Sequence, residues 1–107
     1  MVTADMPQTM DEKRLARVFR ALSNPNRLKL YLMIAEKSEQ SFSAEHECFI
    51  TDIIETLPIG APTVSHHLKE LEGAGLITTE RRGKYLVARV NASVIDEVKK
   101  MLSMQRK

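Results

Sequence analysis

A change of hydrophobic period near Gly75 constrains the fold of this chain more than any other feature. Before it, Val64, Leu68 and Leu71 recur at the i, i+4, i+7 spacing of one helix face. Glycine then ends the helical pattern, as it commonly does. After Leu76 the apolar residues follow the short spacing of strands. The sequence therefore predicts a helix that is followed at once by a hairpin with strands at residues 77–81 and 85–90.

Two amphipathic helices are predicted at the start of the chain. Residues 1–9 show no periodicity, so we expect a flexible arm there and one domain over residues 10–107. The first helix runs from Met10 to near Ser23. Asn24 suits a helix cap and Pro25 the first helical position, so a second helix should follow to about residue 36.

The middle and the end of the chain supply the remaining elements. Residues 37–47 are polar and predict a surface loop, and residues 48–50 predict a short strand. Thr51 can cap a third helix with Ile53, Ile54 and Leu57 on its apolar face. Pro62 fits the first turn of the helix before the hairpin, and an apolar stripe after residue 93 predicts a C-terminal helix. The fold class is therefore mainly α with a small β-hairpin, in the order α-α-β-α-α-β-β-α.

Size and composition exclude several classes of protein. At 107 residues the chain has room for one domain, and a domain this small leaves much apolar surface to bury against another copy. The longest apolar run, residues 30–35, is too short to cross a membrane. The first residues carry Asp5 and no apolar signal region, so we expect a cytoplasmic protein. Cys48 is the only cysteine, which excludes an intrachain disulfide.

The net charge of +2 conceals an uneven distribution along the chain. Residues 11–30 carry six basic and two acidic side chains, whereas residues 36–56 carry one basic side chain and six acidic ones. Residues 60–90 and 96–107 are each basic by two charges. Basic segments on either side of an acidic one suit a protein that turns one surface toward a polyanion.

Two helices joined by a short glycine-containing turn and followed by a basic hairpin match a winged helix-turn-helix that binds double-stranded DNA. If Val64, Leu68 and Leu71 face inward, the polar residues between them project outward. Short hydroxyls and an imidazole can reach base edges in a major groove, while wing cations reach phosphates. The predicted DNA-binding residues are Pro62, Thr63, Ser65, His66, Lys69, Arg81, Arg82 and Lys84.

Two other residues near this motif have competing interpretations. His67 lies toward the inward face of its helix, which favours a packed and hydrogen-bonded side chain over a ligand role. His66 and His67 do not form a metal pair, because adjacent helical residues do not face each other. Arg27 could contact a phosphate or anchor the turn before the second helix.

The segments PTVSHHLKELEGAGLITTERRGKYLVARV and VFRALSNPNRLKLYLMIAE resemble the ArsR/SmtB family of dimeric bacterial repressors. The resemblance covers about residues 11–102. It implies a winged helix-turn-helix and a homodimer in which the first and last helices pack between protomers. The residues expected at that dimer interface are Leu15, Val18, Phe19, Leu22, Val94, Ile95, Val98, Met101 and Leu102.

The usual metal sites of that family are not expected in this chain. Metal-binding members carry two cysteines in a stretch of the form ELCVCDL, where this sequence reads ECFITDI, so Phe49 and Thr51 hold the cysteine positions. Residues 92–107 contain no histidine for the second family site, which leaves Asp96 without partners. Cys48 and His46 could still form a thiol- or metal-responsive site, although Cys48 beside Phe49 reads more simply as a small apolar residue.

The function expected is that of a sequence-specific, homodimeric transcriptional repressor released by an effector that the sequence does not identify. No cofactor is expected. The alternative from another class is a winged-helix module that binds a protein and not DNA, which the acidic loop at residues 37–47 favours. An enzyme is not expected, because Ser65 and His66 have no orienting acid and no nucleophile elbow or phosphate loop is present.

Overall fold

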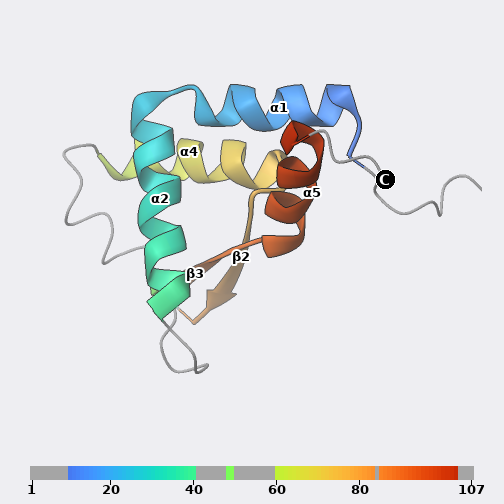
Figure 1. Ribbon diagram of the computed structural model, residues 1–107. Helices are drawn as coiled ribbons and strands as arrows, with labels where there is room; N and C mark the ends of the chain where they lie inside the picture. The colour runs from blue at the N-terminus through green and yellow to red at the C-terminus, as the bar shows by residue number, and fades with distance from the viewer. Residues whose placement is uncertain (1–9, 41–47, 50–59, 84, 104–107) are drawn as a thin grey trace, which may run out of the picture.

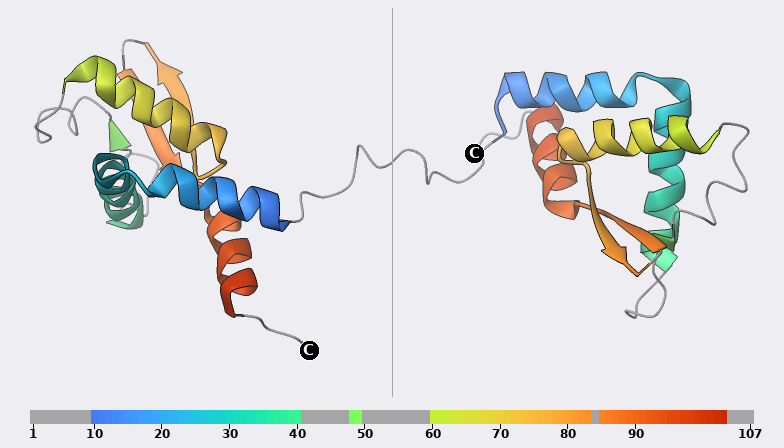
Figure 2. Two further views of the ribbon diagram at one scale, coloured as in Figure 1. Left: turned by 90° about the horizontal axis from the view of Figure 1, so that it is seen from above. Right: turned by 180° about the vertical axis from the view of Figure 1, so that it is seen from behind.

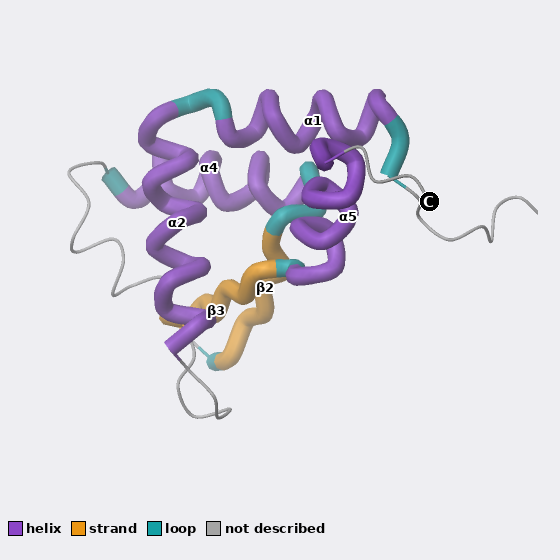
Figure 3. The backbone as a smooth tube through the Cα atoms, in the orientation of Figure 1, coloured by secondary structure: helices purple, strands orange, loops and turns teal. Residues whose placement is uncertain are grey.

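The computed structural model describes residues 10–40, 48–49, 60–83 and 85–103. In the described part of the chain, α1 runs along the top, α2 and α5 descend at the two sides with α4 behind them, and the strands lie beneath (Figures 1 and 3). The predicted N-terminal arm and the predicted helix after Thr51 lie outside the described residues. The elements are α1 (Glu12–Leu22), α2 (Pro25–Gln40), β1 (Cys48–Phe49), α4 (Ala61–Gly73), β2 (Ile77–Arg82), β3 (Tyr85–Val90) and α5 (Ala92–Ser103).

Side-chain caps fix the starts of the first two helices. The Asp11 carboxylate accepts the backbone N–H of Arg14 at 2.8 Å at the start of α1. The Asn24 side chain accepts the backbone N–H of Arg27 at 3.0 Å, which confirms the predicted cap of α2. Each cap of this kind stabilises a helix by about 1 kcal/mol. The Asp11 cap sets where α1 begins, and the Asn24 cap sets where α2 begins after the corner between the two helices.

Helix α2 continues to Gln40, four residues beyond the predicted end near residue 36. That prediction was wrong because it took the polar composition after Glu36 as the start of a loop. Residues 37–40 contain no glycine or proline to stop the helix. Lysine, glutamate and glutamine are also good helix formers, so a polar stretch can continue a helix that is already nucleated.

Helix α4 ends in a Schellman motif, which is why a glycine stands at Gly75. The N–H of Leu76 donates to the Leu71 carbonyl at 3.0 Å, and the N–H of Gly75 donates to the Glu72 carbonyl at 2.9 Å. Gly75 has a φ of 82°, in the left-handed region that favours glycine. The motif turns the chain directly from α4 into β2.

The hairpin belongs to a three-stranded sheet in the order β1-β3-β2. Strands β2 and β3 pair antiparallel from Ile77 opposite Val90 to Arg82 opposite Tyr85, as the sequence predicts for this segment. β1 adds to the free edge of β3 through Cys48 opposite Ala88 and Phe49 opposite Val87. The hairpin is therefore attached to the chain segment that precedes α4 as well as to α4 itself.

The core lies between α2, α4 and the sheet. The largest side chains with less than 2% exposure are Leu30, Ile34, Leu71, Leu76, Ile77, Val18, Val64 and Val87. Burying each such side chain contributes about 1.5–3 kcal/mol. In the described part of the chain, no helix combines the length and apolar character needed to cross a membrane.

Candidate nucleic-acid interface

Helix α4 presents one buried face and one polar face. Val64 and Leu71 are fully buried and Leu68 is 4% exposed, so these three face the core as the helical spacing predicts. Apart from His67, the residues between them are exposed at the surface. The exposed predicted residues of this helix are Pro62, Thr63, Ser65, His66 and Lys69.

His67 is buried and holds α4 against the start of α2. It is 5% exposed, and its Nδ1 lies 3.5 Å from Nη1 of Arg27. Because arginine can only donate, Nδ1 accepts this hydrogen bond. Burial lowers the pKa of His67, and the charges of Arg27 and then His66 lower it further. The imidazole is therefore a neutral packing group, which confirms the prediction of a packed, hydrogen-bonded histidine.

Arg27 anchors the turn before α2. Its Nε donates to the Ala21 carbonyl at 2.7 Å, across the corner between α1 and α2. The same guanidinium contacts His67, so it links three helices at one point. Of the two roles that the sequence left open for Arg27, the structure supports the anchoring role.

The hairpin tip carries exposed cations beside one carboxylate. Arg81 and Arg82 are exposed at the end of β2, and Gly83 has a φ of 60° with open space around it. The Glu80 carboxylate lies 3.4 Å from the guanidinium of Arg82 and 3.4 Å from that of Arg89. These contacts lower the pKa of Glu80, and the contact with Arg82 has the larger effect. Lys84 lies outside the described residues.

The hairpin is also tied to α4. The Thr79 hydroxyl donates to the Glu72 carboxylate at 3.1 Å, which joins β2 to one side of α4. This hydrogen bond holds the hairpin beside α4. In the view from behind, α4 lies in front, between α1 above and the hairpin below (Figure 2).

The predicted interface residues of α1 and α5 differ in exposure. Phe19 is 44% exposed and Leu102 is 57% exposed, whereas Val18 and Val94 are buried inside the protomer. The remaining predicted residues are half-buried against the core, namely Leu15, Leu22, Ile95, Val98 and Met101. Three more large exposed apolar side chains, Leu28, Leu32 and Tyr85, were not among the predicted residues.

Comparison with known proteins identifies the family. Residues 22–80 match the model of a helix-turn-helix domain. The transcriptional repressor SdpR of Bacillus subtilis is 31% identical over 91 residues, which are 84% of this chain and 91% of that protein. The arsenical resistance operon repressor of Staphylococcus xylosus is 27% identical over 89% of this chain and 83% of that protein. This chain belongs to the ArsR family of helix-turn-helix transcriptional regulators.

A solved structure shares the fold of this ArsR-family chain. It is the solution structure of a homodimeric winged helix-turn-helix DNA-binding domain from Mycobacterium bovis, described as a possible ArsR-family regulator. The two superpose with a TM-score of 0.62 at 23% identity, over 92% of this chain and 89% of that one. This similarity confirms the predicted winged helix-turn-helix fold.

No group of three or more histidine, cysteine, aspartate or glutamate side chains is arranged to hold a metal ion among the described residues. The backbone of Cys48 pairs with Ala88 in the sheet. Its side chain and His46 lie outside the part of this ArsR-family chain that the structure describes. The thiol- or metal-responsive alternative therefore stays a prediction from the sequence.

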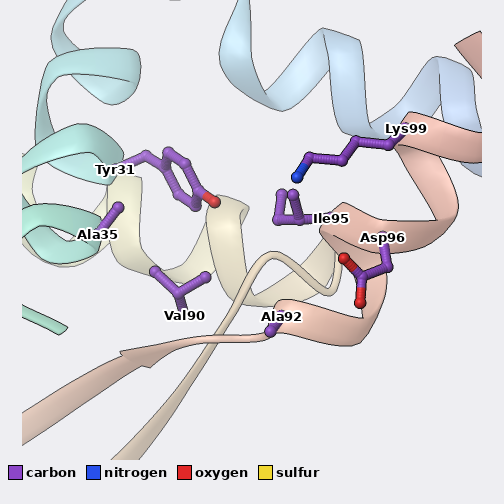
Figure 4. Close-up of a pocket in the computed structure, with 7 residues that line it drawn as sticks. All are labelled: Tyr31, Ala35, Val90, Ala92, Ile95, Asp96 and Lys99. Carbon is purple, nitrogen blue, oxygen red and sulfur yellow. The ribbon is translucent and has the colours of Figure 1, made fainter. Parts of the chain in front are cut away.

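A cavity of about 400 Å³ is lined by residues of α2, the end of β3 and α5. The Tyr31 hydroxyl and the Lys99 ammonium point into it from opposite sides (Figure 4). Burial raises the pKa of the Tyr31 phenol, which keeps it a neutral hydrogen-bond donor. Most of the remaining lining is apolar, contributed by Ala35, Val90, Ala92 and Ile95. This composition suits a small amphipathic molecule better than a DNA phosphate.

Proposed function

We propose that this ArsR-family chain is a homodimeric, sequence-specific transcriptional repressor that acts on double-stranded DNA in the cytoplasm. The observation that carries the proposal is the uncovered polar face of α4, beside a hairpin with exposed arginines. An α-helix fits the major groove, where side chains distinguish base pairs by their donors and acceptors. The helix-turn-helix relatives support this assignment.

The proposed roles of the site residues follow from their position. Ser65 and His66 lie on the polar face of α4 and would contact base edges, with Pro62, Thr63 and Lys69 beside them. The wing residues Arg81, Arg82 and Lys84 would contact phosphate or the minor groove. Phosphate contacts supply affinity and salt dependence, whereas base contacts supply specificity.

The dimer would place two α4 helices in successive major grooves, about 34 Å apart on one face of the duplex. Phe19 on α1 and Leu102 on α5 are the most exposed of the predicted interface residues. Val18 and Val94 are buried inside the protomer, so they would support this surface without contacting the partner copy. The Mycobacterium bovis domain, which shares this fold, is homodimeric, and this supports a homodimer here. An effector would release the DNA by shifting one protomer against the other.

The direct test of the proposed function is selection of bound duplexes from a random pool, together with gel shifts on a random-sequence duplex at low salt. A DNA-binding regulator should bind the random duplex weakly and enrich an imperfect palindrome from the pool. A protein that binds neither would be the protein-interaction module instead. The same selection repeated with metals, thiol oxidants and small metabolites would reveal the class of effector.

The dimer surface can be tested with a matched pair of variants. Phe19→Asp places a charge on the proposed interface and should shift the protein toward monomer, because an unpaired charge is costly to bury. Leu32→Asp is the control, since Leu32 is 55% exposed on α2, outside the predicted interface. Sedimentation velocity would measure both. Equal dissociation in the two variants would argue against the α1 and α5 interface.

A further inference from the structure

A narrow basic cleft lies where α1 passes α4. It has a volume of about 130 Å³, and residues from α1, the start of α2 and the second half of α4 line it. The polar side chains in its lining are three arginines and one glutamate, namely Arg17, Arg20, Arg27 and Glu70. Arg17 and Arg20 are not among the predicted DNA-binding residues, although residues 11–30 are strongly basic.

Within the described part of the chain, two of these arginines have no partner for their charge. Among the described residues, the side chains of Arg17 and Arg20 make no hydrogen bond or ion pair. Arg27 differs, because it is committed to the Ala21 carbonyl and to His67. Glu70 also has no ion-pair partner in the described part of the chain. The lining of the cleft thus holds one carboxylate and three guanidinium groups. The cleft therefore keeps a positive excess that folding does not neutralise.

The cleft is continuous with the polar face of α4. A Cβ built on Gly73 would lie 3.0 Å from Nη2 of Arg17, so this guanidinium rests directly against the end of α4. Gly73 follows His66 and Lys69 by seven and four residues, which places the three on one face of the helix. The proposed base-contacting surface thus leads directly to Arg17.

The basic edge of α1 and the wing lie on opposite sides of α4. In the view from behind, α1 runs along one side of α4 and the hairpin along the other (Figure 2). Arg17 and Arg20 are three residues apart and so share one edge of α1. The major groove is bounded by a phosphate strand on each side, so a helix in the groove needs cations on both of its flanks to reach both strands.

We propose that Arg17 and Arg20 bind the DNA backbone on the side of α4 opposite the wing. The inference rests on the proposed function and adds a second phosphate-binding element to it. Arg27 holds the wall of the cleft in place and does not itself reach the DNA. The two arginines add affinity and no sequence preference, because phosphates are the same at every base pair.

The experiment compares Arg17→Gln/Arg20→Gln with Lys29→Gln/Lys37→Gln as a control of equal charge change. Lys29 and Lys37 are exposed on α2 and do not line the cleft. Binding to a random-sequence duplex and to a selected site is measured across a range of salt concentrations. Each lost phosphate contact lowers the salt slope by about 0.9, so a dimer that loses four contacts should show a slope lower by about 3.6. Specific and random duplexes should weaken by the same factor.

Two further variants keep the test decisive. Arg20→Gln alone leaves the Arg17 contact with Gly73 in place, and should lower the slope by about half as much. Arg17→Lys/Arg20→Lys keeps both charges and should restore most of the slope, which a purely structural role would not predict.

The outcomes separate the two proposals. A slope equal to that of the control variant, in a protein that still binds DNA, would overturn the role of Arg17 and Arg20 and leave the proposed function standing. A wild-type protein that binds no duplex at low salt would overturn both. Circular dichroism of each variant confirms that the fold is retained.

Discussion

The two flanks of α4 carry similar charges but hold them differently. On the hairpin side, Arg82 shares Glu80 with Arg89 at 3.4 Å. On the α1 side, the side chains of Arg17 and Arg20 have no charged partner among the described residues. Both flanks are joined to α4, one through Thr79 and Glu72 and the other through Arg27 and His67.

This difference shows that the number of basic residues in a segment does not measure the charge it offers to a polyanion. The wing stands out in the sequence because its cations surround a turn glycine. Glu80 already balances part of the positive charge of the wing. On α1, Arg17 and Arg20 have no ion-pair partner among the described residues. Only the folded chain shows which cations have a carboxylate beside them.

The largest expected effect lies between the two flanks, on the polar face of α4. Ser65→Ala/His66→Ala should remove base contacts worth about 1–3 kcal/mol each, which is roughly tenfold or more in specific affinity. Binding to random duplex should change little, because neither flank is altered. Titration of a selected site and of a random duplex with the variant measures both effects.

The contrast with the flanks makes this prediction specific. The flank variants should weaken both duplexes equally, whereas this variant should weaken only the selected site. If Ser65→Ala/His66→Ala weakened both duplexes by the same factor, the polar face of α4 would have no base-reading role.

An intermediate effect is expected from the arginines of the wing. Arg81→Ala should cost more affinity than Arg82→Ala, because Arg82 is already paired with Glu80 whereas Arg81 is exposed with no ion pair among the described residues. Each substitution removes two phosphate contacts from the dimer, so it should lower the salt slope by about 1.8 where both contacts are made. Gel shifts at several salt concentrations rank the two variants.

Glu80→Gln provides the complementary control. Removing this carboxylate should strengthen binding only modestly, since an ion pair exposed to solvent contributes little. Unchanged affinity in Glu80→Gln, with equal losses in Arg81→Ala and Arg82→Ala, would show that Glu80 does not restrain the wing.

The smallest expected effect is on the pH dependence of stability. The pKa of His67 is lower in the folded chain than in the unfolded chain, so the unfolded chain binds its proton first as the pH falls. The contribution of His67 to the free energy of unfolding is therefore complete above its unfolded pKa near 6.5. It is lost as the pH falls through the lower pKa of the folded chain. Urea unfolding between pH 8 and pH 5 measures the loss, and His67→Gln should make the curve flatter.

The hairpin flank should respond in a different pH range. The pKa of Glu80 is also lowered by folding, but its ordinary value is 4.5. Its ion pairs are therefore present at neutral pH and are lost only in acid below that value.

A pH profile of His67→Gln identical to that of the wild type between pH 8 and pH 5 would contradict the role of His67 on the α1 flank.

Much of the fold could be predicted from local patterns. The periodicity of Val64, Leu68 and Leu71 placed α4, and Asn24 with Pro25 placed the start of α2, because caps and amphipathic faces depend on nearby residues. The end of α2 was missed, since polar helix formers do not mark a boundary. The pairing of β1 with β3 was also not predicted, because it joins Cys48 to Ala88 across forty residues.

Some features of the candidate site could also be predicted from the sequence, whereas others required the structure. The outward positions of Ser65 and His66 follow from helical spacing alone, and the burial of His67 follows from the same spacing. Its contact with Arg27 required the structure, because the two side chains are forty residues apart and meet only when α2 packs on α4. The burial of Val18 and Val94 also required the structure, because it depends on which side chains pack over each residue.

The sequence by itself determined the class of this protein, because a helical face, a turn glycine and a basic hairpin in fixed order are local features that few folds share. The tertiary structure alone decided which charges remain available. Ion pairs, cleft walls and the two flanks of α4 arise from residues distant in sequence, and whether an arginine can bind a phosphate depends on whether a carboxylate already occupies the space beside it.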